Sequence, residues 1–221
     1  VVQDLTASFN TLAAELETAS GDLSWHYPEA EHLRLKSASG DLTLRAEKLQ
    51  ALRLETVSGD VRAEAQAGVA VLKSLSGDIS WQGSCAELSL RSTSGDLEAA
   101  AETEKAELES KSGDISWLGA CDILTLRSVS GDVRGAGSLR SGELSSVSGE
   151  LSLDLQGVKA QELSCRSTSG DIRLRLPEAL AADIQYSSVS GSVSCSRTVS
   201  PDGAPGLQVR LQTVSGSIRV L

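Results

Sequence analysis

The stretch Ser92-Thr93-Ser94-Gly95-Asp96-Leu97 decides the fold of this 221-residue chain, because close copies of it recur along the whole sequence. Successive copies of its glycine are 18 or 19 residues apart up to Gly149, and then 21, 21 and 25 residues apart. A repeat this short and this regular is typical of a solenoid in which each repeat forms one coil. The eleven repeat glycines are Gly21, Gly40, Gly59, Gly77, Gly95, Gly113, Gly131, Gly149, Gly170, Gly191 and Gly216.

Aliphatic and polar side chains alternate on both sides of each glycine. Around Gly95, Leu88 and Leu90 precede the glycine, and Leu97 and Ala99 follow it. A period of two indicates a β-strand with one buried face, whereas a helix needs spacings of three and four. The sequence therefore predicts an all-β protein, a single parallel β-solenoid (β-helix) of about eleven coils with an 18–21 residue repeat.

The same alternation predicts where the hydroxyl groups of the repeat lie. Continued through the motif, it turns Ser92 and Ser94 inward, where stacked hydroxyls would donate to one another and offset the cost of burial. It turns Thr93 outward, and glycine allows the bend that follows. The outward column is largely aliphatic, which suits either a strand surface or a lateral docking strip. Its members are Ala19, Ala38, Val57, Leu75, Thr93, Lys111, Val129, Val147, Thr168, Val189 and Val214.

Composition narrows the classes of partner. The formal net charge is −10 and the isoelectric point is about 4.7, which argues against nucleic acid, since phosphate binding needs clustered Lys and Arg. The sequence has no run of 18 apolar residues and no recognisable signal peptide. Because it lacks Met and starts in mid-pattern, we expect a trimmed piece of a longer polypeptide.

The two ends of the repeat array differ. Residues 1–11 lack the repeat and are predicted to form an N-terminal cap or linker, with residues 12–221 as the solenoid domain. The last repeat stops on the apolar strand residues Ile218, Val220 and Leu221. An uncapped solenoid end leaves backbone groups unpaired, so these three residues are the expected assembly end of a homo-oligomer.

The repeats resemble those of a bacterial protein family that is labelled an adhesin family. The function of this family is unknown. The resemblance rests on STSGDL at 92–97, SVSGDV at 128–133 and STSGDI at 167–172, and it covers about residues 12–221. It implies a single-domain β-solenoid, often found in envelope proteins behind a membrane segment, with no catalytic residues. The last two repeats depart from the pattern, because Ser192 and Ser217 replace Asp.

The aspartate after each glycine is the first candidate for chemistry. Stacked coils would bring these carboxylates into a line about 5 Å apart, where they repel one another. Either Ca²⁺ bridges them or each accepts backbone hydrogen bonds in its turn. One carboxylate per coil is sparse for calcium, so we expect no cofactor, with calcium as the alternative. The calcium ladder would consist of Asp78, Asp96, Asp114 and Asp132.

Histidines and cysteines offer little further chemistry. His26 and His32 lie in one predicted corner, and the chain has no other histidine for a Ser-His-Asp site. Cys165 and Cys195 fall at inward positions of successive repeats, which leaves both a disulfide and two buried thiols open.

These patterns favour a non-catalytic bacterial surface or envelope solenoid, an adhesin or structural scaffold, outside the cell or in its envelope. Its partner would be an unidentified protein or glycan. The alternatives are a subunit that self-assembles through its ends, a calcium-binding repeat protein and, least favoured, a β-helix enzyme acting on polysaccharide. Such an enzyme needs long loops around a cleft, and most corners here are too short.

Overall fold

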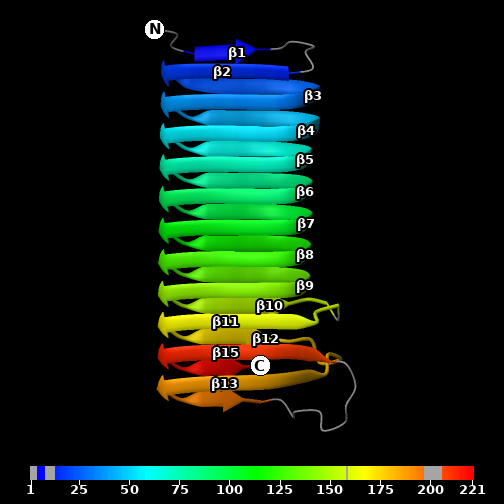
Figure 1. The fold of residues 1–221 in the computed structure, drawn as a ribbon, viewed down its shortest axis with the longest axis vertical. Coiled ribbons are helices and arrows are strands. Elements are labelled where there is room, and N and C mark those ends of the chain that lie inside the picture. The colour runs from blue at the N-terminus through cyan, green and yellow to red at the C-terminus, as the bar shows by residue number, and fades with distance from the viewer. Residues whose placement is uncertain (1–3, 8–12, 158, 197–205) are drawn as a thin grey trace.

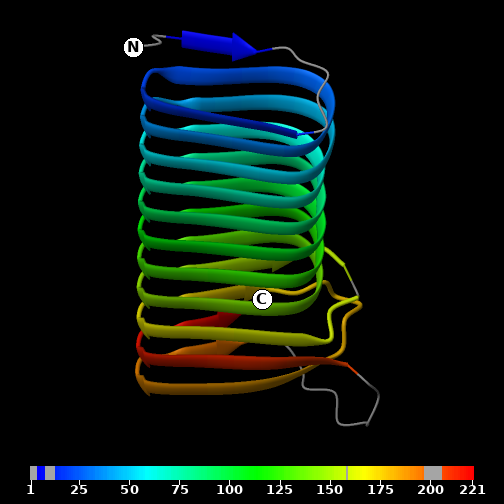
Figure 2. The same cartoon turned by 45° about the horizontal axis from the view of Figure 1, so that its top comes forward.

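The computed structural model describes residues 4–7, 13–157, 159–196 and 206–221, and in them the chain is all β. Sixteen strands form one continuous parallel sheet wound into a flat-sided stack (Figures 1 and 2). The expected single parallel β-solenoid is confirmed, but it has about nine turns and not the eleven coils expected. The strands are β1 (Asp4–Ala7), β2 (Ala13–Ser20), β3 (Asp22–Ser39), β4 (Leu42–Ser58), β5 (Val61–Ser76), β6 (Ile79–Ser94), β7 (Leu97–Ser112), β8 (Ile115–Ser130), β9 (Val133–Ser148), β10 (Leu151–Leu155), β11 (Glu162–Ser169), β12 (Ile172–Arg175), β13 (Ala182–Ser190), β14 (Val193–Cys195), β15 (Leu207–Ser215) and β16 (Ile218–Val220).

Each coil has two walls joined by two corners. The first wall follows a repeat glycine and the second wall leads into the next one, as Ile79–Gln82 and Glu87–Ser94 do within β6. Between them the chain turns at the second corner without leaving the strand, so β3 to β9 each run round a whole coil. Neighbouring coils pair in register, Ile79 with Leu97 and Ser94 with Ser112, so equivalent residues form columns along the stack.

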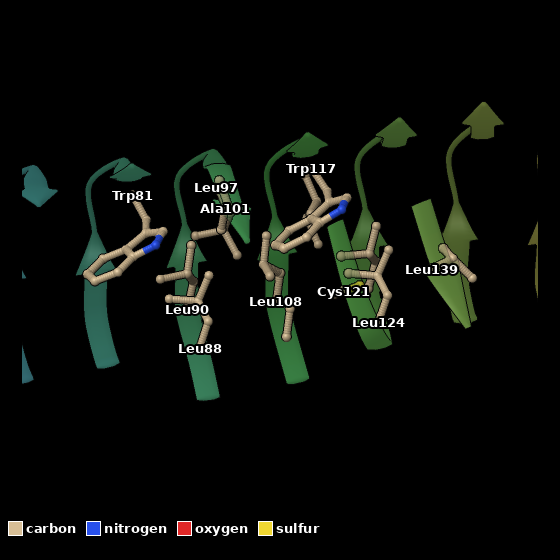
Figure 3. Close-up of a cluster of buried hydrophobic side chains, with 14 of the residues drawn as sticks. Trp81, Leu88, Leu90, Leu97, Ala101, Leu108, Trp117, Cys121, Leu124 and Leu139 are labelled. Atoms are coloured by element: carbon tan, nitrogen blue, oxygen red, sulfur yellow. The ribbon is translucent and has the colours of Figure 1, made fainter. Parts of the chain in front are cut away.

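The core lies between the two walls. Along β6 to β9, large and small residues alternate in one column of the core. Trp81 of β6 and Trp117 of β8 are both buried in the core (Figure 3), and Ala99 of β7 stands between them in register. The next coil has Gly135 in that column. A small residue beside each indole leaves room for the ring, and close packing of this kind is what protein interiors require. The tryptophans therefore fill the core.

The last coil of the chain is not the last coil of the stack. On the second wall the order is β9, β11, β15, β13, and on the first wall it is β9, β10, β12, β16, β14. The chain skips one level on its way to Gly191 and then returns to fill that level with β15 and β16. The long final repeats, of 21 and 25 residues, supply the connections for this step.

Burial of apolar surface explains the inserted coil. Its inward residues include Leu207, Val209 and Leu211, each exposed by 1% or less. The coil that takes the outer place instead carries Tyr186 at the position of Leu211, and Tyr186 is 53% exposed. A phenol tolerates water at its tip better than leucine does, so the more apolar coil is covered on both sides.

One prediction about the ends is thereby corrected. Ile218 and Val220 are 1% exposed and lie between β12 and β14, so they and Leu221 are not the end of the stack. At the other end, β1 pairs in parallel with Asp22–Trp25 of β3. Residues 4–7 are thus a strand of the stack, residues 1–3 and 8–11 lie outside the described residues, and the N-terminal cap or linker stays a prediction.

No helix that could span a bilayer occurs in the part of the chain that the structure describes.

Candidate functional site

The eleven repeat glycines stack in one column, where the chain passes from the second wall to the first. A Cβ atom on Gly113 would lie 2.1 Å from the carbonyl oxygen of Gly95, and the other members of the column meet their neighbours at 2.0 to 2.2 Å. Gly191 contacts Gly216, and Gly216 contacts Gly170, so the column includes the inserted coil. Only glycine allows backbones to approach this closely. We call this column and its flanking residues the glycine corner.

Buried hydroxyl groups tie the glycine corner together. Ser110, three residues before Gly113, is 1% exposed and donates to the carbonyl oxygen of Gly95 at 3.1 Å. The same bond, at 3.1 to 3.4 Å, is made by Thr56, Ser74, Ser92, Ser110, Ser128, Ser146, Ser188 and Thr213. The hydroxyls are inward as predicted, but they bond to glycine carbonyls and not to one another.

The second serine of the motif is not inward. Ser94 is exposed, and the outward neighbour Thr93 is half-buried. The prediction for Ser94 was wrong because alternation holds only while the strand is straight. The chain begins to bend after Ser92, and both residues before Gly95 then lie on the outside of the corner. The carbonyl of Ser94 still accepts the N–H of Gly77, at 3.2 Å.

The aspartates form a ladder of carboxylate-to-backbone hydrogen bonds. Oδ1 of Asp96 accepts the N–H of Asp114 in the next coil at 2.8 Å. The inserted coil takes part, because the N–H of Ser217 donates to Oδ1 of Asp171 at 2.8 Å. The turn would otherwise leave this N–H without a partner, so each carboxylate completes the backbone pairing of its neighbour. The acceptors are Asp22, Asp41, Asp60, Asp78, Asp96, Asp114, Asp132 and Asp171.

Arginines bridge part of the aspartate row. Arg134 contacts Oδ2 of Asp114 at 3.3 Å and Oδ2 of Asp132 at 2.6 Å. Arg62 joins Asp41 and Asp60 in the same way, at 3.8 and 2.8 Å. These exposed pairs offset the repulsion along the row, each by about 1 kcal/mol or less.

The four carboxylates of the predicted calcium ladder, Asp78, Asp96, Asp114 and Asp132, lie in one line, and Oδ1 of each accepts a backbone N–H. Over the described residues, no group of three or more His, Cys, Asp or Glu side chains could hold a metal ion. Calcium binding stays a prediction.

The outward column beside the glycine corner is an aliphatic strip. Val129, Val147, Val214 and Val189 are 48%, 50%, 51% and 80% exposed and come from successive levels apart from Thr168. A shallow groove of about 570 Å³ runs along this part of the strip. The outward prediction for these side chains agrees with their exposure.

The histidines and cysteines do not form a site. His26 and His32 are both exposed. No disulfide joins Cys165 to Cys195, because the inserted coil separates their levels and they lie on opposite walls. Burial raises the pKa of the Cys165 thiol to about 12, and burial beside Asp122 does the same for Cys121.

Thiol reactivity provides a direct check on these positions. A raised pKa leaves almost no thiolate at pH 8, and the thiolate is the reactive form. We expect Cys121 and Cys165 to resist a maleimide reagent in the native protein and to react within minutes after unfolding in denaturant. Mass spectrometry of the labelled peptides gives the result, and rapid native labelling of Cys165 would contradict its burial.

Comparison with known proteins agrees with the architecture. The sequence pattern of the Toastrack DUF4097 family matches residues 5–134 and, shifted along the repeats, residues 84–221. No curated protein and no solved structure matches the chain. Together the two matches span nearly the whole chain, including every repeat glycine. This chain belongs to the Toastrack DUF4097 family, whose function is unknown.

Proposed function

We propose that this protein is a non-catalytic structural domain, a rigid β-solenoid scaffold of the bacterial cell envelope. One observation carries the proposal: in most coils, the polar side chains that recur in the repeat bond to the backbone of a neighbouring coil. Ser110 and Asp96 illustrate this, the first by donating to Gly95 and the second by accepting from Asp114. Groups fixed in this way hold the stack together and are not poised towards a substrate.

The place of the scaffold is proposed from the family resemblance, and its partner from its repetitive surface. The resemblance to envelope solenoids favours the cell envelope or the outside of the cell. The Toastrack DUF4097 family is not a known enzyme family. An adhesive role would use a long repetitive surface such as the aliphatic strip, and a protein or glycan ligand stays a prediction.

Two substitutions of Asp96 separate a structural carboxylate from a metal-binding one. Asp96→Asn keeps an oxygen that can accept the N–H of Asp114, and it removes one charge from a repelling row. We expect its free energy of unfolding to stay within about 0.5 kcal/mol of the parent. Asp96→Ala removes the acceptor and should cost about 1 kcal/mol. Urea denaturation followed by circular dichroism measures both.

Calcium provides the complementary test. The melting temperature should be the same in millimolar Ca²⁺ and in a chelator, for the parent and for Asp96→Asn. A calcium-specific rise that Mg²⁺ does not reproduce, and that Asp96→Asn abolishes, would overturn the structural role and favour a calcium-binding repeat.

A further inference from the structure

At the end of the stack formed by β13 and β14, no further strand from the described part of the chain covers the core. Tyr186 and Val193 point inward yet are 53% and 37% exposed, whereas their neighbours one level in, Leu211 and Ile218, are 0% and 1% exposed. Among the described residues, β13 pairs only with β15, and β14 only with β16. The outer edge of β13 therefore presents backbone groups and apolar side chains that another strand could cover.

The two walls do not end at the same level. The first wall ends with β14 and the second with β13, and β14 lies half a turn further out, as the lowest strand in Figure 1. The next position on the second wall, outside β13 and beside β14, has no strand among the described residues. We call it the open strand position.

We propose that a second copy of this chain fills the open strand position with its own β2, so that copies associate head to tail. β2 has eight residues and β13 has nine, and each leads into a repeat glycine, Gly21 and Gly191. The register of the repeat would then place Leu16 of one copy on Tyr186 of the other. Leu16 is half-buried in the free chain and would be covered, as would Tyr186.

The hydrogen bond that Thr18 makes supports the presence of a neighbouring strand outside β2. In most inner coils, the hydroxyl three residues before the glycine donates to a glycine carbonyl of the adjacent coil, as Thr56 does to Gly40, whereas the hydroxyls of Ser37 and Ser167 make no such bond. Thr18 donates instead within its own strand, to the carbonyl of Ser20 at 2.9 Å. In the docked pair Thr18 would meet the carbonyl of Gly191 in the other copy, which continues both the ladder and the glycine column.

The charges of the two ends are complementary. Residues 1–31 contain six acidic residues and no Lys or Arg, a formal charge of −6. Residues 163–221 contain six arginines and four acidic residues, which gives 6 − 4 = +2 in a chain of net charge −10. Opposite charge favours contact between unlike ends and disfavours two acidic ends meeting.

Docking of β2 on β13 also has a consequence for β1. β1 and β14 are short strands of the same wall, four and three residues long, and β1 lies against Asp22–Trp25 of β3. When β2 of one copy occupies the open strand position of the other copy, β14 of that other copy would lie beside β3, at the place that β1 fills in the free chain. Association would therefore exchange β1 for β14, and a chain without residues 1–7 should associate more tightly.

The test uses two variants that each block one end. Tyr186→Lys places a charge on the C-terminal end, and Leu16→Lys places a charge of the same sign on the N-terminal end, so the two blocked ends repel each other in a mixture. Light scattering over a range of concentrations should show association of the parent and a monomer for each variant alone. An equimolar mixture should form a dimer and nothing larger, because only one pair of intact ends remains. Gln185→Lys, on the outward face of β13, is the matched control and should associate at least as well as the parent.

Each other outcome overturns a defined part of the inference. A parent that stays monomeric at all concentrations overturns end-to-end association, and the scaffold role, which this inference goes beyond, would stand. Dimers of Leu16→Lys alone would show that two C-terminal ends meet, and dimers of Tyr186→Lys alone that two N-terminal ends do. Weaker association after removal of residues 1–7 would overturn the exchange of β1 for β14. Circular dichroism melts of all variants establish that each is folded.

Discussion

Replacing Gly113 by alanine is expected to cost about 3 kcal/mol of unfolding free energy, at the upper end of the effects of overpacking. The added Cβ would lie 2.1 Å from the carbonyl oxygen of Gly95 and 2.6 Å from its carbonyl carbon. Both are backbone atoms, so the contact can be relieved only by separating two coils. That movement would also lengthen the bond from Ser110 to Gly95. The shift of the urea midpoint relative to the parent measures the cost.

Gly142→Ala is the matched control, because the same methyl group is added in the core of the same stack. There the nearest atoms are side-chain ends, Leu163 Cδ1 at 2.9 Å and Leu139 Cδ1 at 3.3 Å. Rotation of a leucine can absorb the strain, and alanine also reduces the entropy of the unfolded chain. We expect a cost of about 1 kcal/mol or less. Equal costs at the two positions would show that the glycine column is not under steric control.

Leu211→Lys should destabilise the protein by about 3 to 5 kcal/mol, because it places an unpaired charge between two covering coils. Leu211 is 0% exposed and pairs with Cys165 of β11 on one side and Tyr186 of β13 on the other. Thermal melts, with hydrogen exchange in β11, β13 and β15, should show a loss of protection on both sides of the substitution.

Tyr186→Lys is the control for Leu211→Lys, since the two residues occupy the same column one level apart. At the end of the stack a lysine can extend its ammonium group into water, and we expect a cost below about 1 kcal/mol. The comparison decides the order of the coils. If the coils stacked in chain order, Tyr186 would be inside and Leu211 at the end, and the two costs would be reversed.

Much of the fold could be predicted because each coil repeats the same local signals. Pairs such as Leu88 and Leu90 specify a buried wall, and the regular spacing of the glycines specifies a parallel stack. Prediction fails where the alternation of a strand is continued beyond the straight part of that strand. Alternation placed Ser92 correctly and Ser94 wrongly, because only Ser92 lies in the straight part of the strand.

The order of the final coils was not predictable from the repeat itself. The motif at Gly191 and the motif at Gly216 fit either level, since both supply the same backbone. What distinguishes them is the apolar content of their inward residues, with Tyr186 in one and Leu211 in the other, and the extra chain length between them. Both facts are present in the sequence, but they acquire meaning only once two alternative stacking orders are compared.

The acceptor of the hydroxyl ladder was also missed, although a signal for it exists. Serine or threonine stands three residues before the repeat glycine in all eleven copies, as Ser92 does before Gly95. A fixed offset between the hydroxyl residue and the glycine indicates that the two residues interact in the stack. The aspartate ladder follows the same logic, and there the backbone-bonded alternative describes the observed geometry.

The inserted coil also has a consequence for how the protein is made. A ribosome delivers β13 and β14 before β15 and β16, so the emerging polypeptide must hold a gap open or pair β13 with β11 and later give that pairing up. Either route delays completion of this end until the final residues have been synthesised. A chain released early, before Leu207, would lack the strand that joins β11 to β13. A quality-control protease would then encounter an unpaired segment at this end of the stack. The coils from β3 to β9 would resemble those of the complete chain.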